Sequence, residues 1–239
     1  MTQTQQAQRG CVIIPAYNEA RRIAAVVRGA RARVPATIVM DDGSLDGTAR
    51  EAEQAGATVL RHDTNRGKGA ALDTGFRYAR GQGFDYVITM DGDGQHDPVD
   101  LPKFVERYVG TGSPVLIGNR MDRAEAMPWR RRAVNRAMSW MLSREMGQSV
   151  PDTQCGFRLF RCDVVPLVAA ESARYAAESE ILLNVAERGI RMDAVPIATI
   201  YRGEKSKISP LRDSLRFFGM LRRHRRRKCA AQGKGKIEA

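Results

Sequence analysis

DYVITMDGDGQHD (residues 85–97) carries the strongest structural signal in this chain. It begins as an apolar run rich in β-branched residues and ends in two carboxylates, Asp91 and Asp93, with one glycine between them. A run that is apolar throughout is typical of a strand buried on both faces, and the residues just after such a strand lie where open α/β sheets bind ligands. An isolated Asp-Gly-Asp-Gly is more often a plain turn. Its position after a buried strand favours a ligand site.

Similar apolar runs flank this one on both sides. Segments with the apolar spacing of helices separate them, so strand and helix alternate along the first half of the chain. This alternation predicts a doubly wound, mostly parallel α/β sheet with helices on both faces, folded as a single domain. The five runs are residues 11–15, 36–42, 57–62, 85–91 and 114–119.

The spacing predicts an N-cap for one helix and an apolar side for another. The stripe at residues 23–30 follows Asn18, a residue type that commonly caps helices, so we expect Asn18 to be the N-cap. A longer helix is predicted at 128–146, with its apolar side formed by Val134, Ala137, Met138, Met141 and Leu142. Further elements are expected as a strand at 157–160, a helix at 178–188 and a strand at 194–200.

Composition places the chain among globular proteins. Of its 239 residues, 43% are hydrophobic and 28% charged. We find no apolar run of about 18 residues and no signal-peptide pattern at the start, and we therefore expect neither a membrane span nor export. The four cysteines form no C-x-x-C pair, which argues against a zinc knuckle or a disulfide framework and favours a reducing cytoplasm.

The net charge of +12 is concentrated at the C-terminal end. Residues 202–239 hold 13 of the 39 basic residues but only three of the 27 acids. The rest of the chain is therefore close to neutral. A non-enzymatic basic module that binds nucleic acid is a distant alternative, because no nucleic-acid motif accompanies the charge.

Polar residues follow each of the first four predicted strands. Carboxylates, glycines and one lysine at neighbouring strand ends suit a polyphosphate nucleotide with a divalent metal ion. Asp91 and Asp93 are the candidate ligands of Mg²⁺ or Mn²⁺, and Gln95 could supply a third oxygen. The Gly67-Lys68 pair lacks P-loop spacing.

The ordered series of motifs resembles the family 2 glycosyltransferases with the GT-A fold. Within that family it is most similar to the dolichol-phosphate mannose synthase-like branch, which transfers sugars to polyprenyl phosphates. The motifs are VIIPAYNEA, VMDDGSLDGT, NRGKGAAL, MDGDGQHDP, IGNR, DTQCGFRLF and VPIATIYRGEKSK, in order between about residues 11 and 215. The resemblance implies a metal-dependent, inverting transferase with a UDP- or GDP-linked sugar donor.

The resemblance also implies roles for single residues. Base and ribose would be surrounded by Pro15, Tyr17, Glu19, Asp41 and Asp42, with Gly67 and Lys68 closing over them. The diphosphate and its metal ion would lie at Asp91, Gly92, Asp93 and Gln95, where Gly92 replaces the family's usual alanine, and a segment with Arg202, Ser206 and Lys207 would clamp the donor. The acceptor phosphate would be received by Arg120, Arg131 and Asn135.

Two chemical classes of acceptor are compatible with the sequence. A phosphate acceptor needs arginines to position it, whereas a soluble or polyketide-like hydroxyl acceptor needs a base, for which Asp152 is the candidate. His96 follows the metal motif and is more typical of a structural or supporting group than of a base.

The chain end bears on where the enzyme would act. We expect a flexible start at 1–9, a GT-A domain at 10–208, a basic amphipathic helix at 209–228 and a flexible tail at 229–239. The apolar face of the helix, with Leu211, Leu215, Phe218 and Leu221, would either pack on the body or lie on an anionic membrane. We accordingly expect a cytoplasmic enzyme that is peripheral on the inner face of the cytoplasmic membrane, bound to lipid or to a membrane-protein partner.

Overall fold

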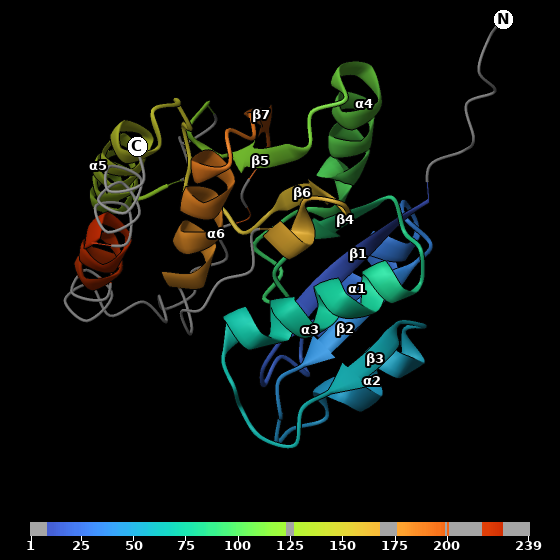
Figure 1. Cartoon of the computed structure of the whole chain (residues 1–239). Coiled ribbons are helices and arrows are strands. Elements are labelled where there is room, and N and C mark those ends of the chain that lie inside the picture. The colour runs from blue at the N-terminus through green and yellow to red at the C-terminus, as the bar shows by residue number, and fades with distance from the viewer. Residues whose placement is uncertain (1–8, 123–126, 168–175, 199, 201–216, 227–239) are drawn as a thin grey trace, which may run out of the picture.

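A seven-stranded sheet forms the centre of the molecule, with the strand order β3-β2-β1-β4-β6-β5-β7. The computed structural model describes residues 9–122, 127–167, 176–198, 200 and 217–226 (Figure 1). The strands are β1 (Gly10–Ala16), β2 (Thr37–Asp41), β3 (Thr58–Arg61), β4 (Tyr86–Thr89), β5 (Val115–Asn119), β6 (Arg158–Arg161) and β7 (Met192–Pro196). The helices are α1 (Ile23–Arg31), α2 (Thr48–Gln54), α3 (Lys68–Gly81), α4 (Leu101–Thr111), α5 (Trp129–Met146) and α6 (Ala176–Glu187), with 3₁₀ turns η1 (Pro98–Asp100) and η3 (Val165–Leu167).

The doubly wound, mostly parallel α/β prediction is confirmed. β1 pairs in parallel with β2 and β4, and β2 with β3. Every residue of β2, β4 and β5 is buried, which is the environment that a continuous apolar run indicates. Helix α3 approaches β1 so closely that a Cβ at Gly75 would lie 2.7 Å from Cγ2 of Ile13.

Strand β6 is antiparallel to both of its neighbours, β4 and β5. Thr89, the last residue of β4, therefore lies opposite Arg158, the first residue of β6. The Thr89 hydroxyl donates to the carbonyl of Gly156 at 2.8 Å. This reversal brings the DTQCGF segment to the edge of the sheet at which Asp91 emerges.

The expected cap of α1 is wrong. Helix α1 begins after Arg22, and no side chain caps it. Asn18 instead has a positive φ of 55° and joins two loops, because its N–H donates to the Ser44 hydroxyl and its side-chain oxygen accepts from the N–H of Leu45.

Helix α5 lies where the spacing predicts it, but only part of the expected apolar stripe faces inward. Its buried residues are Asn135, Ser139 and Leu142, while Val134 is 54% exposed. The inner side is partly polar because Ser139 accepts a hydrogen bond from the backbone of Thr153 and contacts the Thr153 hydroxyl.

Residues 217–226 are helical and pack on the body. Phe217, Met220 and Leu221 form a small core with Leu142 of α5 and Leu183 of α6. Arg222 and Arg226 are exposed, whereas Arg225 pairs with Glu145 at 2.7 Å. Of the expected apolar face, Leu221 therefore packs on the body, whereas Phe218 is 51% exposed. Leu211, Leu215, residues 1–8 of the expected flexible start at 1–9, and the expected flexible tail at 229–239 lie outside the described residues. Arg9 is described, and its N–H donates to the Asp85 carboxylate at 2.7 Å.

Within the part of the chain that the structure describes, we find no helix with both the length and the apolar character that a bilayer-spanning segment requires.

Candidate active site

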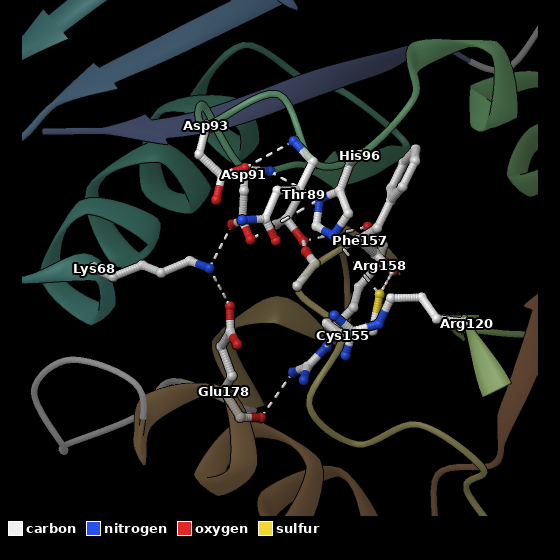
Figure 2. Close-up of polar contacts among 12 residues, drawn as sticks. Lys68, Thr89, Asp91, Asp93, His96, Arg120, Cys155, Phe157, Arg158 and Glu178 are labelled. Carbon is white, nitrogen blue, oxygen red and sulfur yellow. Dashed lines mark hydrogen bonds and ion pairs between the residues drawn. The ribbon is translucent and has the colours of Figure 1, made fainter. Parts of the chain in front are cut away.

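Lys68 lies at the centre of the candidate site and joins two carboxylates from distant parts of the chain. Its Nζ is 2.5 Å from Oδ1 of Asp91, which follows β4, and 2.5 Å from Oε1 of Glu178 in α6 (Figure 2). Burial alone would lower the pKa of Lys68, but the charges of Asp91 and Glu178 outweigh it and raise that pKa. Burial alone would raise the pKa of Asp91, and the neighbouring ammonium instead holds it well below its usual value. Lys68 and Asp91 are thus both charged near neutral pH.

Gly156 completes the surroundings of this ion-pair cluster. A Cβ at this position would lie 2.8 Å from Oε1 of Glu178, 3.0 Å from Nζ of Lys68 and 3.1 Å from Oδ1 of Asp91. The cluster therefore needs a residue without a side chain at this point of the DTQCGF segment.

Asp93 lies beside Asp91 with a different electrostatic environment. Partial burial and the negative charge of Asp91 raise the pKa of Asp93 to about 6. Its Oδ1 accepts from the N–H of Gln95 at 2.9 Å. Two crowded carboxylates of this kind gain from a divalent cation placed between them, so the donor set fits the predicted metal ion.

The described His, Cys, Asp and Glu side chains do not form a closed metal site around Asp91 and Asp93. Among the described residues, no three His, Cys, Asp or Glu side chains are close enough to hold a metal ion together. Mg²⁺ is commonly bound by one or two carboxylates, with phosphate oxygens and water completing its shell. A site of this type thus matches a metal ion that arrives with a nucleotide diphosphate.

His96 holds the backbone of Asp91 in place through a hydrogen bond. Its Nδ1 accepts from the N–H of Asp91 at 3.2 Å, and its ring lies 5.2 Å from that of Phe157. Burial lowers the pKa of His96 to about 4, so that the ring is neutral near pH 7. This arrangement agrees with a supporting role.

Asp42 shapes the loop that precedes α3. Its two oxygens accept from the N–H groups of Arg66 and Gly67, at 2.9 and 2.7 Å, and one of them also contacts His62 at 2.7 Å. Gly67 has a φ of 90°, which glycine adopts without strain. Asp42 therefore fixes the backbone from which Lys68 projects.

The other predicted donor residues surround the ends of β1 and β2. Asp41 is fully buried, accepts from the N–H of Ser44, and has its Oδ2 3.1 Å from Nε of Arg61 outside hydrogen-bond geometry. Glu19 is buried and its N–H donates to the Thr48 hydroxyl, whereas Tyr17 is 40% exposed. Gly92 lies against this end, since a Cβ there would come within 3.3 Å of the carbonyl oxygen of Pro15.

Arg120 and Asp152 form a buried ion pair. Nε and Nη2 of Arg120 donate to the two carboxylate oxygens of Asp152 at 2.6 and 2.9 Å, and the Arg120 N–H donates to the same carboxylate. Asp152 is fully buried. The charge of Arg120 also reaches the main cluster, where it contributes to the lowered pKa of Asp91.

The remaining acceptor candidates lie on α5. Asn135 is buried, with its Nδ2 3.9 Å from Sδ of Met127, and Arg131 is half-buried one turn earlier. The predicted donor clamp, with Arg202, Ser206 and Lys207, lies outside the described residues.

Three residues that the sequence did not single out belong to the site. Glu178 and Gly156 contact Lys68 as described, and Arg158 is buried with its guanidinium donating to the carbonyls of Cys155, Thr153 and Glu178. The Arg158 charge within the apolar run FRLF was the available signal, because a charged residue is rarely fully buried without partners. For Glu178, the sequence holds no comparable signal.

Comparison with known proteins identifies the family. The family model for glycosyl transferase family 2 matches residues 11–166. An uncharacterized protein of Methanocaldococcus jannaschii is 35% identical over 196 residues, covering 80% of this chain and 81% of that protein. The undecaprenyl-phosphate mannosyltransferase of Micrococcus luteus is 32% identical over 206 residues, covering 81% of this chain and 84% of that one.

Solved structures agree on the fold. The crystal structure of glucosyl-3-phosphoglycerate synthase from Mycobacterium tuberculosis superposes with a TM-score of 0.72 at 22% identity, covering 91% of this chain and 80% of that one. With its GT-A fold and the family match over most of the sheet, this chain belongs to glycosyl transferase family 2.

Proposed function

We propose that this glycosyltransferase moves a sugar from a nucleotide-sugar to a polyprenyl phosphate at the inner face of the cytoplasmic membrane. The relatives support the acceptor class, because they include the undecaprenyl-phosphate mannosyltransferase and a polyprenol monophosphomannose synthase from Mycolicibacterium smegmatis. The donor would be a sugar linked to UDP or to GDP.

The Arg120–Asp152 pair is the observation that carries the choice of acceptor. A hydroxyl acceptor needs a base that can reach it, but both oxygens of Asp152 are bound by Arg120 in a fully buried position. A phosphate acceptor is already anionic and needs cations that orient it. Asp152 is therefore a positioning residue that fixes the guanidinium of Arg120 for an anionic acceptor.

The donor side supports a divalent metal ion at Asp91 and Asp93. Crowding of these carboxylates raises the pKa of Asp93 to about 6, which a bound cation would relieve. A crystal structure of the mycobacterial glucosyl-3-phosphoglycerate synthase, at 21% identity, contains Mn²⁺ and uridine diphosphate. When bound, Mg²⁺ or Mn²⁺ would neutralise charge on the leaving diphosphate.

The reaction itself is an in-line displacement with inversion. A phosphate oxygen of the acceptor forms the new bond to the anomeric carbon, while the bond from that carbon to the diphosphate breaks and nucleoside diphosphate leaves with the electron pair. Arg120 and Arg131 orient the acceptor, and Lys68 offers a positive charge to the diphosphate.

The acceptor is tested by comparing a short-chain polyprenyl phosphate with the matching polyprenol, over a panel of UDP- and GDP-sugars. We expect release of nucleoside diphosphate and a glycosylated lipid only with the phosphate form. Equal turnover with polyprenol or a soluble alcohol would contradict the proposal and favour the hydroxyl-acceptor enzyme.

The metal assignment is tested with Asp93→Asn, with Asp73→Asn as a matched control. Asp73 is a half-exposed carboxylate on α3 whose ion pair is with Arg77. We expect Asp93→Asn to lower turnover about 100-fold or more at an unchanged unfolding midpoint, and Asp73→Asn to behave as the parent. Full activity of Asp93→Asn, or of the parent in excess chelator, would refute the metal site.

A further inference from the structure

The outward face of α5 gathers exposed aromatic and apolar side chains. Trp129 is 70% exposed, Trp140 63% and Val134 54%. The small residues Ala133 and Ala137 are also exposed and fall at helical spacing between the two tryptophans. We call these five residues the α5 outer face. Such large exposed apolar side chains on one helix mark an interaction surface.

Arginines are interleaved with this face. The guanidinium of Arg130 lies 5.3 Å from the ring centroid of Trp129, and that of Arg144 lies 5.8 Å from the ring centroid of Trp140. Arg136 is exposed on the same side. Within Trp129–Met146 the sole acid is Glu145, which pairs with Arg225. The α5 outer face is therefore apolar and positively charged together.

The neighbouring helix at 217–226 continues this character. It packs against α5 through Phe217, Met220 and Leu221, and Figure 1 shows it beside α5 at the end of the molecule away from β3. It exposes Phe218 at 51%, together with Arg222 and Arg226. Two adjoining helices thus present the same mixture of residues.

We propose that the α5 outer face docks on an anionic lipid bilayer, with Trp129 and Trp140 inserted at the headgroup level. Tryptophan prefers the boundary between hydrocarbon and water, and the arginines complement anionic headgroups. The aliphatic Ala133, Val134 and Ala137 gain from transfer into lipid but offer nothing to the bases of a nucleic acid. The inference deepens the proposed function and rests on it, because a polyprenyl phosphate would be reached from this surface through Arg131 and Asn135 on the inner side of the same helix.

The two tryptophans make this face directly measurable. They are the only two in the chain, so intrinsic tryptophan emission reports on α5 alone. With the full-length protein, we expect vesicles of phosphatidylglycerol and phosphatidylcholine to shift the emission to shorter wavelength, brominated lipids to quench it, and high salt to reverse both effects. Vesicles of phosphatidylcholine alone should leave the spectrum unchanged.

Variants identify the residues responsible. Trp129→Ser/Trp140→Ser should lower co-sedimentation with the anionic vesicles by at least about tenfold. The control Val99→Ser/Val109→Ser removes two side chains that are 51% and 60% exposed elsewhere, and it should bind as the parent does. Transfer to a short-chain polyprenyl phosphate in detergent should be equal in all three proteins.

Several outcomes would overturn the proposal. They are unchanged emission while the protein co-sediments, absence of binding at low salt, and equal loss in both double variants. A blue-shifted emission that dilution alone reverses would identify a second copy of the chain as the occupant, and a shift with single-stranded nucleic acid but not with vesicles would identify that partner instead. Failure of sugar transfer by the parent would contradict the proposed function while leaving the vesicle measurements interpretable.

Discussion

Gly156 shows how much the site depends on the absence of one methyl group. The nearest atoms to a Cβ there belong to the three charged residues of the Lys68 cluster. We expect Gly156→Ala to push these side chains apart and to lower turnover about tenfold or more, with a smaller effect on stability because the far ends of flexible side chains can move. Steady-state kinetics and the unfolding midpoint measure the two effects.

Gly110→Ala is the matched control, because a Cβ at Gly110 in α4 meets nothing within 4 Å. It should leave turnover unchanged. If both alanine variants kept parental activity, the Lys68 cluster would not need the geometry described.

His96 predicts a pH dependence of stability. Burial lowers its pKa from 6.5 in the unfolded chain to about 4 in the folded protein, so the unfolded chain binds the extra proton first as the pH falls. Its contribution to the free energy of unfolding is complete above pH 6.5 and is lost toward pH 4, at up to about 1.4 kcal/mol for each pH unit. Urea unfolding at pH 7 and pH 5 measures this loss.

The variant His96→Asn supplies the reference, since it does not titrate there. The stability advantage of the parent over this variant should shrink between pH 7 and pH 5. An advantage that stayed constant or grew would mean that His96 is not held neutral in the folded protein.

At the scale of elements, the strands were the most predictable part of the fold. The runs at residues 11–15, 36–42 and 85–91 coincide with β1, β2 and β4, because a strand buried on both faces must be apolar throughout. The four residues of β6 do not indicate whether the strand is parallel or antiparallel to its neighbours. That direction depends on the path by which the chain returns to β4 and β5. The face of α5 was predicted only in part, because Asn135 and Ser139 are held inside by contacts to Met127 and Thr153, which lie outside the helix and do not enter its periodicity.

The residues of the candidate site also divide into those that the sequence predicts and those that it does not. Strand-end residues such as Asp42 and Asp91 were predictable, because parallel strands bring their carboxyl ends to one edge. Glu178 was not, since its approach to Lys68 depends on the docking of α6 against the sheet half that carries α3.

The loop before α3 yields a prediction of its own. Asp42 accepts from two backbone N–H groups and from His62, and an amide oxygen can replace only one of its two carboxylate oxygens as an acceptor. We expect Asp42→Asn to loosen this loop and to weaken nucleotide binding about tenfold or more, with the sheet intact. Calorimetric titration with nucleoside diphosphate and Mn²⁺ measures the change. The half-exposed Asp73→Asn serves again as control. An unchanged affinity in Asp42→Asn would count against the role of Asp42 as the anchor of the loop.

At the scale of the whole molecule, the C-terminal segment stabilises the half of the protein that carries α5 and α6. Phe217, Met220 and Leu221 are buried there, and each buried side chain of this size contributes about 1.5–3 kcal/mol. Removal of residues 217–239 should therefore lower the unfolding midpoint by several degrees and expose apolar surface, measured by thermal unfolding and dye binding.

Removal of residues 227–239 alone is the control. This change keeps the buried side chains at 217–221, and we expect parental stability. Equal midpoints for the two truncations would show that the helix at 217–226 does not support the fold.

Lys68 gives the resting enzyme an internal counter-ion. Because the pKa of Lys68 is raised and that of Asp91 lowered, neither of these two groups changes charge over the physiological pH range. Under the proposed function, the diphosphate would attract the Lys68 ammonium while a divalent cation takes its place beside Asp91. Lys68 and Asp91 would each gain a new partner of opposite charge as they lose each other. We therefore expect the donor and the metal ion to bind together.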